Sequence, residues 1–327
     1  MAWKNLSQTD MSDALLRHHE ALEEFDDLNE LIDWKAIETE LSCLHNKKRG
    51  EQAWPPLLMF KALLLQSWYG LSDPQLEKQL ARDLLFRRFI GLSLSEGVPD
   101  HSTLWRFRNL LDKARLLEPL LMEINRQLSV QGLLIKTGEI SIVDATVIEA
   151  KQCRPRKNAK GDNTQDKEAG YNVKVAATGK KTTTYGYKAH VNSDEDGFIK
   201  AVDYTAANQH DSHSLTKVLT GQEQQVYADK AYASDRHDQL LAAQGITNSI
   251  LHKARRGQRL SAEQKAQNRL WSGVRSTVER VFGILKLHYR IGKARCLGLK
   301  RNWGCFMLVA MAYNIKRGRA IHREMWV

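Results

Sequence analysis

The spacing of apolar residues changes once along the chain, from a helical period in the first 135 residues to short strand-like runs after residue 138. In the first part, Gly, Pro, Ser and Asp stand where helix ends need them. We therefore predict an all-helical domain over residues 1–135. Its predicted helices are two in residues 1–50, the second around Leu31–Leu44, and then 56–69, 74–90, 102–113 and 118–131.

After residue 138, runs of Ile, Val, Tyr and Thr favour strands, and two helices fit between the later runs. Three strands followed by helix, strand, helix and strand are the order of a mixed sheet flanked by helices. We therefore predict an α/β domain over residues 136–327. Its predicted strands are 140–148, 184–192, 198–204, 226–228 and 246–251, and its predicted helices are 213–219, 234–244 and 274–286.

Positive charge is concentrated at the end of the chain. The net charge is +11, yet residues 251–327 hold 18 Lys/Arg against 3 Asp/Glu, so the residues before them sum to −4. Aromatic residues are interleaved with these cations, for example Trp271 and Trp303. A basic C-terminal helical tail of this kind favours non-specific binding to a polyanion such as DNA, and the alternative is a solvated cationic surface.

The segment Lys151–Lys181, between the first two predicted strands, is rich in Lys, Arg, Asn, Gly and Thr and almost without apolar residues. This composition predicts a mobile basic insertion. The insertion is either an arm that orders on DNA or a solvated loop.

The chain carries no sign of export or of a membrane anchor. Its N-terminus is polar and acidic, with 11 Asp/Glu against 6 Lys/Arg in residues 1–50, and its apolar runs are too short to span a bilayer. The four cysteines lack the paired spacing of a zinc site and are too few for a disulfide scaffold. We therefore expect a cytoplasmic protein with reduced thiols and no membrane partner.

One carboxylate, Asp144, lies inside the strand-forming run Ile140–Ala150. A buried charge costs several kcal/mol unless it is compensated, and a metal ion is one natural compensation. Two later residues offer partners of the same kind: Asp229 ends the predicted strand 226–228, and Glu279 lies on the predicted helix 274–286. Asp144, Asp229 and Glu279 are therefore our candidate catalytic residues and metal ligands.

The helix that carries Glu279 has an apolar stripe, formed by Val278, Val281, Phe282 and Leu285, that predicts packing on the sheet. Carboxylates that converge at strand ends suit Mg²⁺, and two ions roughly 4 Å apart can activate an attacking hydroxyl and stabilise a leaving oxygen of a phosphodiester.

Four cations are candidate DNA contacts. Arg275 lies one helical turn before Glu279 and can pair with a carboxylate or a phosphate, and Lys286 follows two turns later. Arg106 and Arg108 lie on the second helix of a pair, 74–90 and 102–113, that resembles a helix-turn-helix reader. The alternative for this second pair is a solvated helix surface.

Several other residues are set aside. Two-metal chemistry needs no separate general base, so His190, His210 and His213 are not assigned to catalysis. Asp194 and Asp196 suit a hairpin turn. Asp203 is the substitute if Asp229 is not a ligand. Trp54, Trp68 and Trp105 are expected in the core.

Three segments around the carboxylates, IVDATVIEA, VYADKAYAS and RSTVERVFGILK, resemble the catalytic blocks of bacterial insertion-sequence transposases with an Asp-Asp-Glu site, specifically the IS-five family. The resemblance extends to PPLLMFKALLLQSWYGLSDPQLEKQL and VPDHSTLWRFRNLL in the helical region, and to YGYKAHVNSD and TAANQHDS between the blocks. Related families carry a tyrosine three positions before the arginine of the third block, where this chain has Ser272, with Trp271 beside it.

The resemblance implies a ribonuclease-H-like catalytic domain that uses two Mg²⁺ ions, with Mn²⁺ as a substitute. It also implies a transposase that cleaves at the ends of its element and joins the 3′-hydroxyl to target DNA. Its partners would be the terminal inverted repeats, the target duplex and a second copy of the chain, at the bacterial nucleoid. The alternatives are an inactive DNA-binding descendant and a nuclease without strand transfer.

Overall fold

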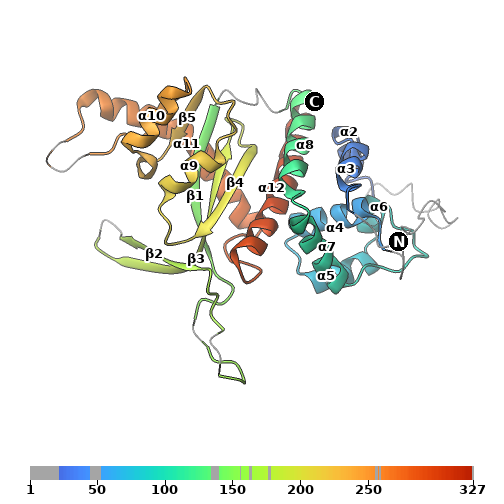
Figure 1. The fold of residues 1–327 in the computed structure, drawn as a ribbon. Coiled ribbons are helices and arrows are strands. Elements are labelled where there is room, and N and C mark those ends of the chain that lie inside the picture. The colour runs from blue at the N-terminus through green and yellow to red at the C-terminus, as the bar shows by residue number, and fades with distance from the viewer. Residues whose placement is uncertain are drawn as a thin grey trace. The chain divides into compact units, whose positions relative to one another are not determined.

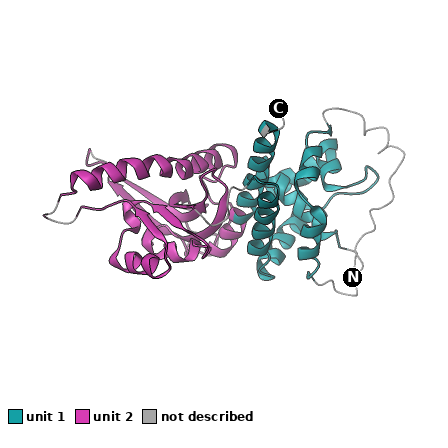
Figure 2. Ribbon diagram, turned by 90° about the horizontal axis from the view of Figure 1, so that it is seen from above, with its two compact units in different colours: residues 1–133, 307–327 teal, residues 134–306 magenta. Residues whose placement is uncertain are grey.

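The chain folds into two compact units (Figure 2). Unit 1 comprises residues 1–133 and 307–327, and unit 2 comprises residues 134–306. The predicted boundaries differ, because they place residues 307–327 with the α/β domain. The computed structural model describes residues 22–44, 53–133, 140–154, 156–161, 164–175, 178–254, 257 and 259–325.

Unit 1 is helical in its described residues, as predicted. The apolar helix α4 starts at Pro56, where a proline costs no hydrogen bond, and nearly all of its residues are buried. Gly70, just beyond its end, has a φ of +62°, which glycine adopts without strain. The helices are α2 (Asp26–Leu31), α3 (Trp34–Leu41), α4 (Pro56–Trp68), α5 (Asp73–Arg82), α6 (Leu84–Ile90), α7 (His101–Lys113), α8 (Leu117–Val130) and the second part of α12 (Leu299–Met325). The first helix predicted in residues 1–50 falls mainly outside the described residues.

The single helix predicted for residues 74–90 is two helices, α5 and α6. Asp83 has an extended backbone between them, and its carboxylate accepts a hydrogen bond from the Phe86 amide. Aspartate competes with the helix for backbone donors and is favoured at an N-cap, which explains the break. The predicted two-helix reader is therefore a three-helix arrangement of α5, α6 and α7.

The middle of the C-terminal helix, residues 306–315, is core and not a solvated tail. Residues 306–315 are all buried, and apart from the Tyr313 hydroxyl, Asn314 carries the single polar side chain in that run. The indole of Trp68 donates a hydrogen bond to the Ala312 carbonyl at 2.6 Å, and the Asn314 amide donates to Asn125 at 2.7 Å. A helix that is apolar on every side has to be enclosed, which the count of basic residues did not reveal.

Unit 2 is built on a six-stranded mixed sheet (Figure 1). Leaving out β2, the strand order is β4-β3-β1-β5-β6, in which β4, β3 and β1 pair antiparallel and β1, β5 and β6 pair parallel. The strands are β1 (Ile140–Glu149), β2 (Gly170–Val175), β3 (Lys181–Ser193), β4 (Ile199–Ala206), β5 (Gln225–Ala228) and β6 (Thr247–Ile250).

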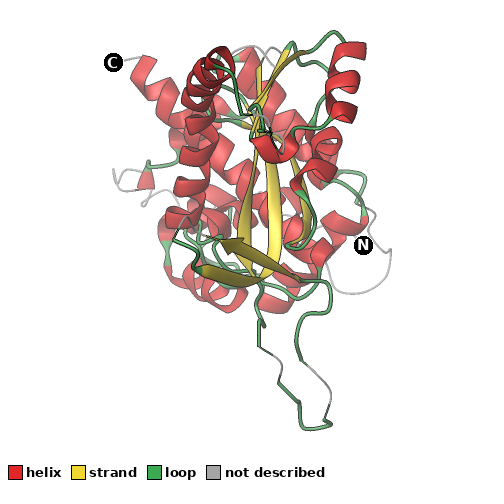
Figure 3. Ribbon diagram, turned by 90° about the vertical axis from the view of Figure 1, so that its left-hand side faces the viewer, coloured by secondary structure: helices red, strands yellow, loops and turns green. Residues whose placement is uncertain are grey.

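Helices cover both faces of this sheet (Figure 3). Val143 packs in a buried cluster with side chains of α9 (Leu215–Val218) and α10 (Asp235–Ala243), whereas its neighbour Asp144 contacts α11 (Ala262–His288). Successive strand residues point to opposite faces, so α11 lies on the face opposite α9 and α10. This mixed sheet between helices confirms the predicted ribonuclease-H-like fold.

Part of the predicted basic insertion is a strand. Strand β2 pairs antiparallel with Lys181–Gly186 of β3 and forms a hairpin with it. Its alternation of Tyr171, Val173 and Val175 with polar residues is a strand signal that the high content of Lys, Asn and Gly concealed. All three of these side chains are exposed.

None of the helices in the described part of the chain has the length and hydropathy needed to cross a membrane.

Candidate active site

Sheet register places the two aspartates side by side. Strands β1 and β5 are parallel, and the last registered pair is Val143 with Ala228, so Asp144 and Asp229 are the next residues on neighbouring strands. Adjacent strands are about 4.8 Å apart, which brings the two carboxylates to one edge of the β1–β5 ladder. Residues far apart in the sequence thus become neighbours through one pairing.

Helix α11 supplies the third carboxylate. The predicted stripe of Val278, Val281, Phe282 and Leu285 is buried, and α11 packs on β1 and β5. Glu279 lies at the margin of this stripe, with 62% of its side chain exposed. The helix therefore presents Glu279 to the same edge that carries the aspartates.

Arg275 lies among all three carboxylates. Its Nη2 is 3.1 Å from Oδ2 of Asp144 and 3.7 Å from Oε1 of Glu279, and its Nη1 is 3.8 Å from Oδ1 of Asp229. The arginine side chain is 10% exposed. One guanidinium thus joins three elements at the centre of the candidate site.

Asp144 is the most constrained of the three acids. Burial raises its pKa above the ordinary value, against the opposing effect of the Arg275 guanidinium. Its Oδ1 accepts a hydrogen bond from the Ala145 amide at 2.8 Å. A buried carboxylate whose charged form is disfavoured gains most from a further cation.

Two neutral groups, Tyr232 and His190, lie behind Asp144 on the opposite face of the sheet. Tyr232 is fully buried, and burial, with Asp144 acting in the same direction, raises its pKa well above the ordinary value. The Tyr232 hydroxyl lies 3.4 Å from Nδ1 of His190, and Nε2 of His190 lies 2.9 Å from the Thr205 hydroxyl. Burial lowers the pKa of His190 to about 4, so the ring is neutral near pH 7 and is a structural partner.

The donor set fits a hard divalent cation in chemical type, because all three side chains offer carboxylate oxygens, the ligands that Mg²⁺ prefers. In the arrangement observed for the described residues, no three acidic, His or Cys side chains are close enough to form a metal-holding group. The guanidinium lies where the three carboxylates converge. The three carboxylates therefore have the oxygen atoms and the negative charge that a divalent ion needs, but the Arg275 guanidinium lies between them in this structure.

The other predicted DNA contacts have different surroundings. Arg106 is exposed on α7, whereas Arg108 is 12% exposed and pairs with Asp73 at 2.5 Å and with Gln66 at 2.7 Å. Arg108 holds α7 to α5 and α4 and is withdrawn from the DNA-binding set. Lys286 lies on the solvent-exposed side of α11. Neighbouring protein atoms that displace water from its amino group, together with the nearby Lys174 of β2, lower its pKa.

Asp203 and the Asp194–Gly197 turn lie apart from the three carboxylates. Asp203 pairs with Lys217 at 3.4 Å. The Asp194 carboxylate accepts a hydrogen bond from the Phe198 amide at 2.7 Å, which confirms the turn between β3 and β4.

One aromatic residue near a candidate site, Trp105, differs from expectation. Trp105 is 44% exposed beside Arg106, so the prediction that it is a core residue is wrong, whereas Trp68 is buried as predicted. The Trp271 ring lies 5.1 Å from the His252 ring. The sequence signal for this exposure is the neighbouring Arg106, which places Trp105 on a polar face of the helix.

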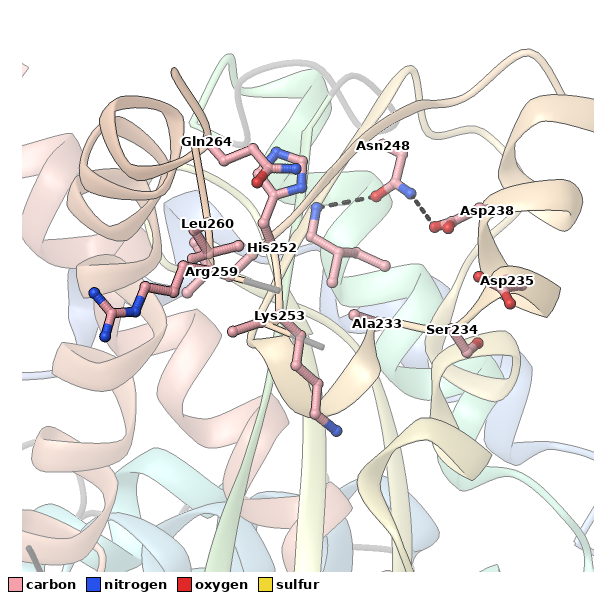
Figure 4. A pocket seen from close by; sticks show the side chains of 13 residues that line it. Ala233, Ser234, Asp235, Asp238, Asn248, His252, Lys253, Arg259, Leu260 and Gln264 are labelled. Atoms are coloured by element: carbon pink, nitrogen blue, oxygen red, sulfur yellow. Dashed lines mark hydrogen bonds between the residues drawn. The ribbon is translucent and has the colours of Figure 1, made fainter. Parts of the chain in front are cut away.

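A pocket beyond β5 and β6 is lined by acids from α10, Asp235 and Asp238, and by the cations Lys253 and Arg259 (Figure 4). None of the three candidate carboxylates is among its described lining residues. The pocket is therefore separate from the carboxylate cluster.

Comparison with known families agrees with this geometry. Residues 10–110 match a transposase domain family (DUF772), and residues 135–315 match the transposase DDE domain family. The second match covers more than half of the chain and contains β1, β5 and α11. Such transposases act on DNA and depend on divalent metal. With its carboxylates on the strands and helix that this match spans, the chain belongs to the DDE transposases of insertion sequences.

Proposed function

We propose that this transposase cleaves DNA at the ends of its element and joins the exposed 3′-hydroxyl to target DNA, with Asp144, Asp229 and Glu279 as its catalytic carboxylates. The observation that carries the proposal is the convergence of three carboxylates from β1, the end of β5 and α11 on one guanidinium. Two partly buried aspartates and a helical glutamate held this close together repel one another, which lowers stability unless a cation offsets their charge.

The residues divide the work as follows. Asp144 and Asp229 would hold divalent metal, two Mg²⁺ ions or Mn²⁺ in their place, and Glu279 would complete the ligand set from the exposed margin. The chemistry that such a metal would supply is a lower pKa for the attacking hydroxyl and stabilisation of the leaving oxygen. Tyr232 stays protonated near the site, because burial, with the charge of Asp144 acting in the same direction, raises its pKa well above the ordinary value.

The DNA contacts follow from exposed cations. Lys286 lies two helical turns beyond Glu279, and its neighbour Lys174 on the β2–β3 hairpin adds a second positive charge. On unit 1, Arg106 and the exposed Trp105 form a contact for the terminal repeat. We assign end recognition and oligomerisation to the helical unit, and expect a dimer or larger assembly, because two ends must be joined.

The experiment is incubation of the purified protein with labelled duplex that carries the element's own ends, with and without Mg²⁺. The variant Asp144→Asn tests the site. Asp203→Asn is the matched control, since Asp203 is also a strand aspartate but pairs with Lys217. We expect cleaved and joined products with the wild type and the control, and a loss of at least about 1,000-fold with Asp144→Asn.

The products separate the alternatives. Cleavage without joined products would indicate a nuclease that lacks strand transfer. Binding without cleavage, equal in wild type and variant, would indicate a DNA-binding descendant. Unchanged metal-dependent cleavage by Asp144→Asn would refute the site assignment.

A further inference from the structure

We infer that Arg275 is a resident counter-cation of the carboxylate cluster, which must withdraw from between the acids before a metal ion binds. The inference rests on the proposed metal site of Asp144, Asp229 and Glu279. It gives the arginine a role before DNA is bound, in addition to the phosphate contact expected from the sequence.

The contacts of Arg275 are with carboxylates from three separate elements. Both terminal nitrogens are used, with Nη2 reaching Asp144 and Glu279 and Nη1 reaching Asp229, all within 3.8 Å. At 10% exposure, the Arg275 side chain in this position offers little surface to a DNA phosphate. Its present contacts therefore compete with a contact to the DNA backbone.

The fit of Arg275 in this place is incomplete. Its Nε is buried and has no hydrogen-bond partner among the described residues. A buried donor without an acceptor destabilises the position that it occupies. The charge of the carboxylates, more than a complete set of hydrogen bonds, therefore keeps the guanidinium in place, and a stronger cation can displace it.

Arg275 and a metal ion would compete for the same carboxylate oxygens, because both are cations. Three carboxylates and one guanidinium leave the cluster with a formal charge of −2, which attracts a divalent ion. An ion bound to the same oxygens would lie within a few ångströms of the guanidinium, where two cations repel strongly. The side chain belongs to α11, whose buried stripe fixes the backbone, so the withdrawal is a change of side-chain rotamer.

Withdrawal links metal loading to DNA binding. A displaced guanidinium recovers its N–H donors and can bind a phosphate in a bidentate manner. Before metal arrives, the same group neutralises part of the cluster and limits repulsion between the acids. A purely structural ion pair would behave in the opposite way, because its removal would misplace the ligands and weaken metal binding.

The test is Mn²⁺ binding by the full chain without DNA, measured by calorimetry on four proteins. These are the wild type, Arg275→Gln, Arg280→Gln and Asp144→Asn. Arg280 is the matched control, because it is an exposed arginine on the same helix that contacts Thr277. We expect Arg275→Gln to bind Mn²⁺ about tenfold more tightly than the wild type. Arg280→Gln should match the wild type, and Asp144→Asn should lose the site.

A second measurement uses the wild type alone. Phenylglyoxal modification followed by mass spectrometry reports the accessibility of each arginine. Arg275 should be protected without metal and should react at least about tenfold faster with saturating Mn²⁺, while exposed Arg280 reacts equally in both conditions. This measurement carries the inference if Arg275→Gln does not fold.

The outcomes are distinct. Unchanged or weaker Mn²⁺ binding by folded Arg275→Gln, or constant protection of Arg275 in metal-loaded wild type, overturns the inference and leaves the proposed function standing. Wild-type binding that is not lost in Asp144→Asn contradicts the proposed metal site itself.

Discussion

Arg106 and Arg108 are two positions apart on α7, and their surroundings are opposite. Arg106 is exposed beside Trp105, and Arg108 joins Asp73 and Gln66 inside the helical unit. Similar residues in one short motif thus have different physical roles. An arginine in a basic motif can be a structural residue, and its ion-pair partner identifies it.

We predict that Arg108→Gln lowers the free energy of unfolding by about 2–4 kcal/mol, because it leaves the partly buried Asp73 without its cation. Arg106→Gln should change stability by less than about 0.5 kcal/mol and should weaken DNA binding. Thermal unfolding and DNA titration of the two variants provide the check. Equal unfolding temperatures would contradict the structural role of Arg108.

His190 predicts a dependence of stability on acid. Burial lowers its folded-state pKa from 6.5 to about 4. A depressed histidine pKa means that its contribution to stability is complete above about pH 6.5 and is lost as the pH falls toward 4. Denaturant titrations across this range should show less acid destabilisation in His190→Gln than in the control His210→Gln, whose histidine is exposed. Parallel curves for wild type and His190→Gln would show that another group is responsible.

At the scale of elements, α11 and α12 are both 27 residues long and carry glycine in their interiors, but they have different environments. Helix α11 buries one stripe and leaves its other face to solvent. Helix α12 is enclosed around residues 306–315. The same substitution should therefore have opposite effects on the two helices.

We predict that Gly283→Ala on α11 stabilises the protein by about 0.5–1 kcal/mol, because an added Cβ meets no heavy atom within 4 Å and the unfolded chain loses entropy. Gly318→Ala on α12 should destabilise by about 1–3 kcal/mol, because the Cβ would lie 2.6 Å from a methyl group of the buried Leu128. Differential scanning calorimetry on both variants measures the contrast. If both substitutions stabilised the protein, the Leu128 side chain could move away from the new Cβ without loss of stability.

At the scale of the whole molecule, a net charge of +11 favours association with DNA. Part of that charge is already engaged, since Arg319 and Arg323 pair with Asp27 and Arg275 pairs with the carboxylates. The charge that acts on DNA is therefore smaller than the count of basic residues.

We predict that DNA affinity falls by about 1,000-fold or more between 50 and 200 mM salt, as expected when roughly six phosphates are neutralised. Lys286→Gln should reduce the slope of log affinity against log salt by about 1, because it removes one phosphate contact. Arg323→Gln should leave the slope unchanged, since Arg323 pairs with Asp27. Fluorescence anisotropy at several salt concentrations tests both. An unchanged slope for Lys286→Gln would remove it from the contact set.

Local pattern was sufficient for most elements and for choosing three carboxylates that the fold brings together. Apolar spacing located α4, α7, α8 and α11. Asp144 and Asp229 were recognisable because each is a charged residue within or directly after an apolar strand. These features depend on neighbouring residues, whose steric and hydrophobic preferences act over a few positions. The break at Asp83 and the strand β2 have local signals too, but competing composition concealed them.

Long-range packing determined the remainder. Residues 307–327 join the helical unit because an apolar helix needs enclosure, and no short window shows which surface encloses it. Arg108 turns to Asp73, and Arg275 stands among acids from β1, β5 and α11. Charge counts treat every arginine alike, whereas the fold sets the distance between charges, and electrostatic energy depends on that distance.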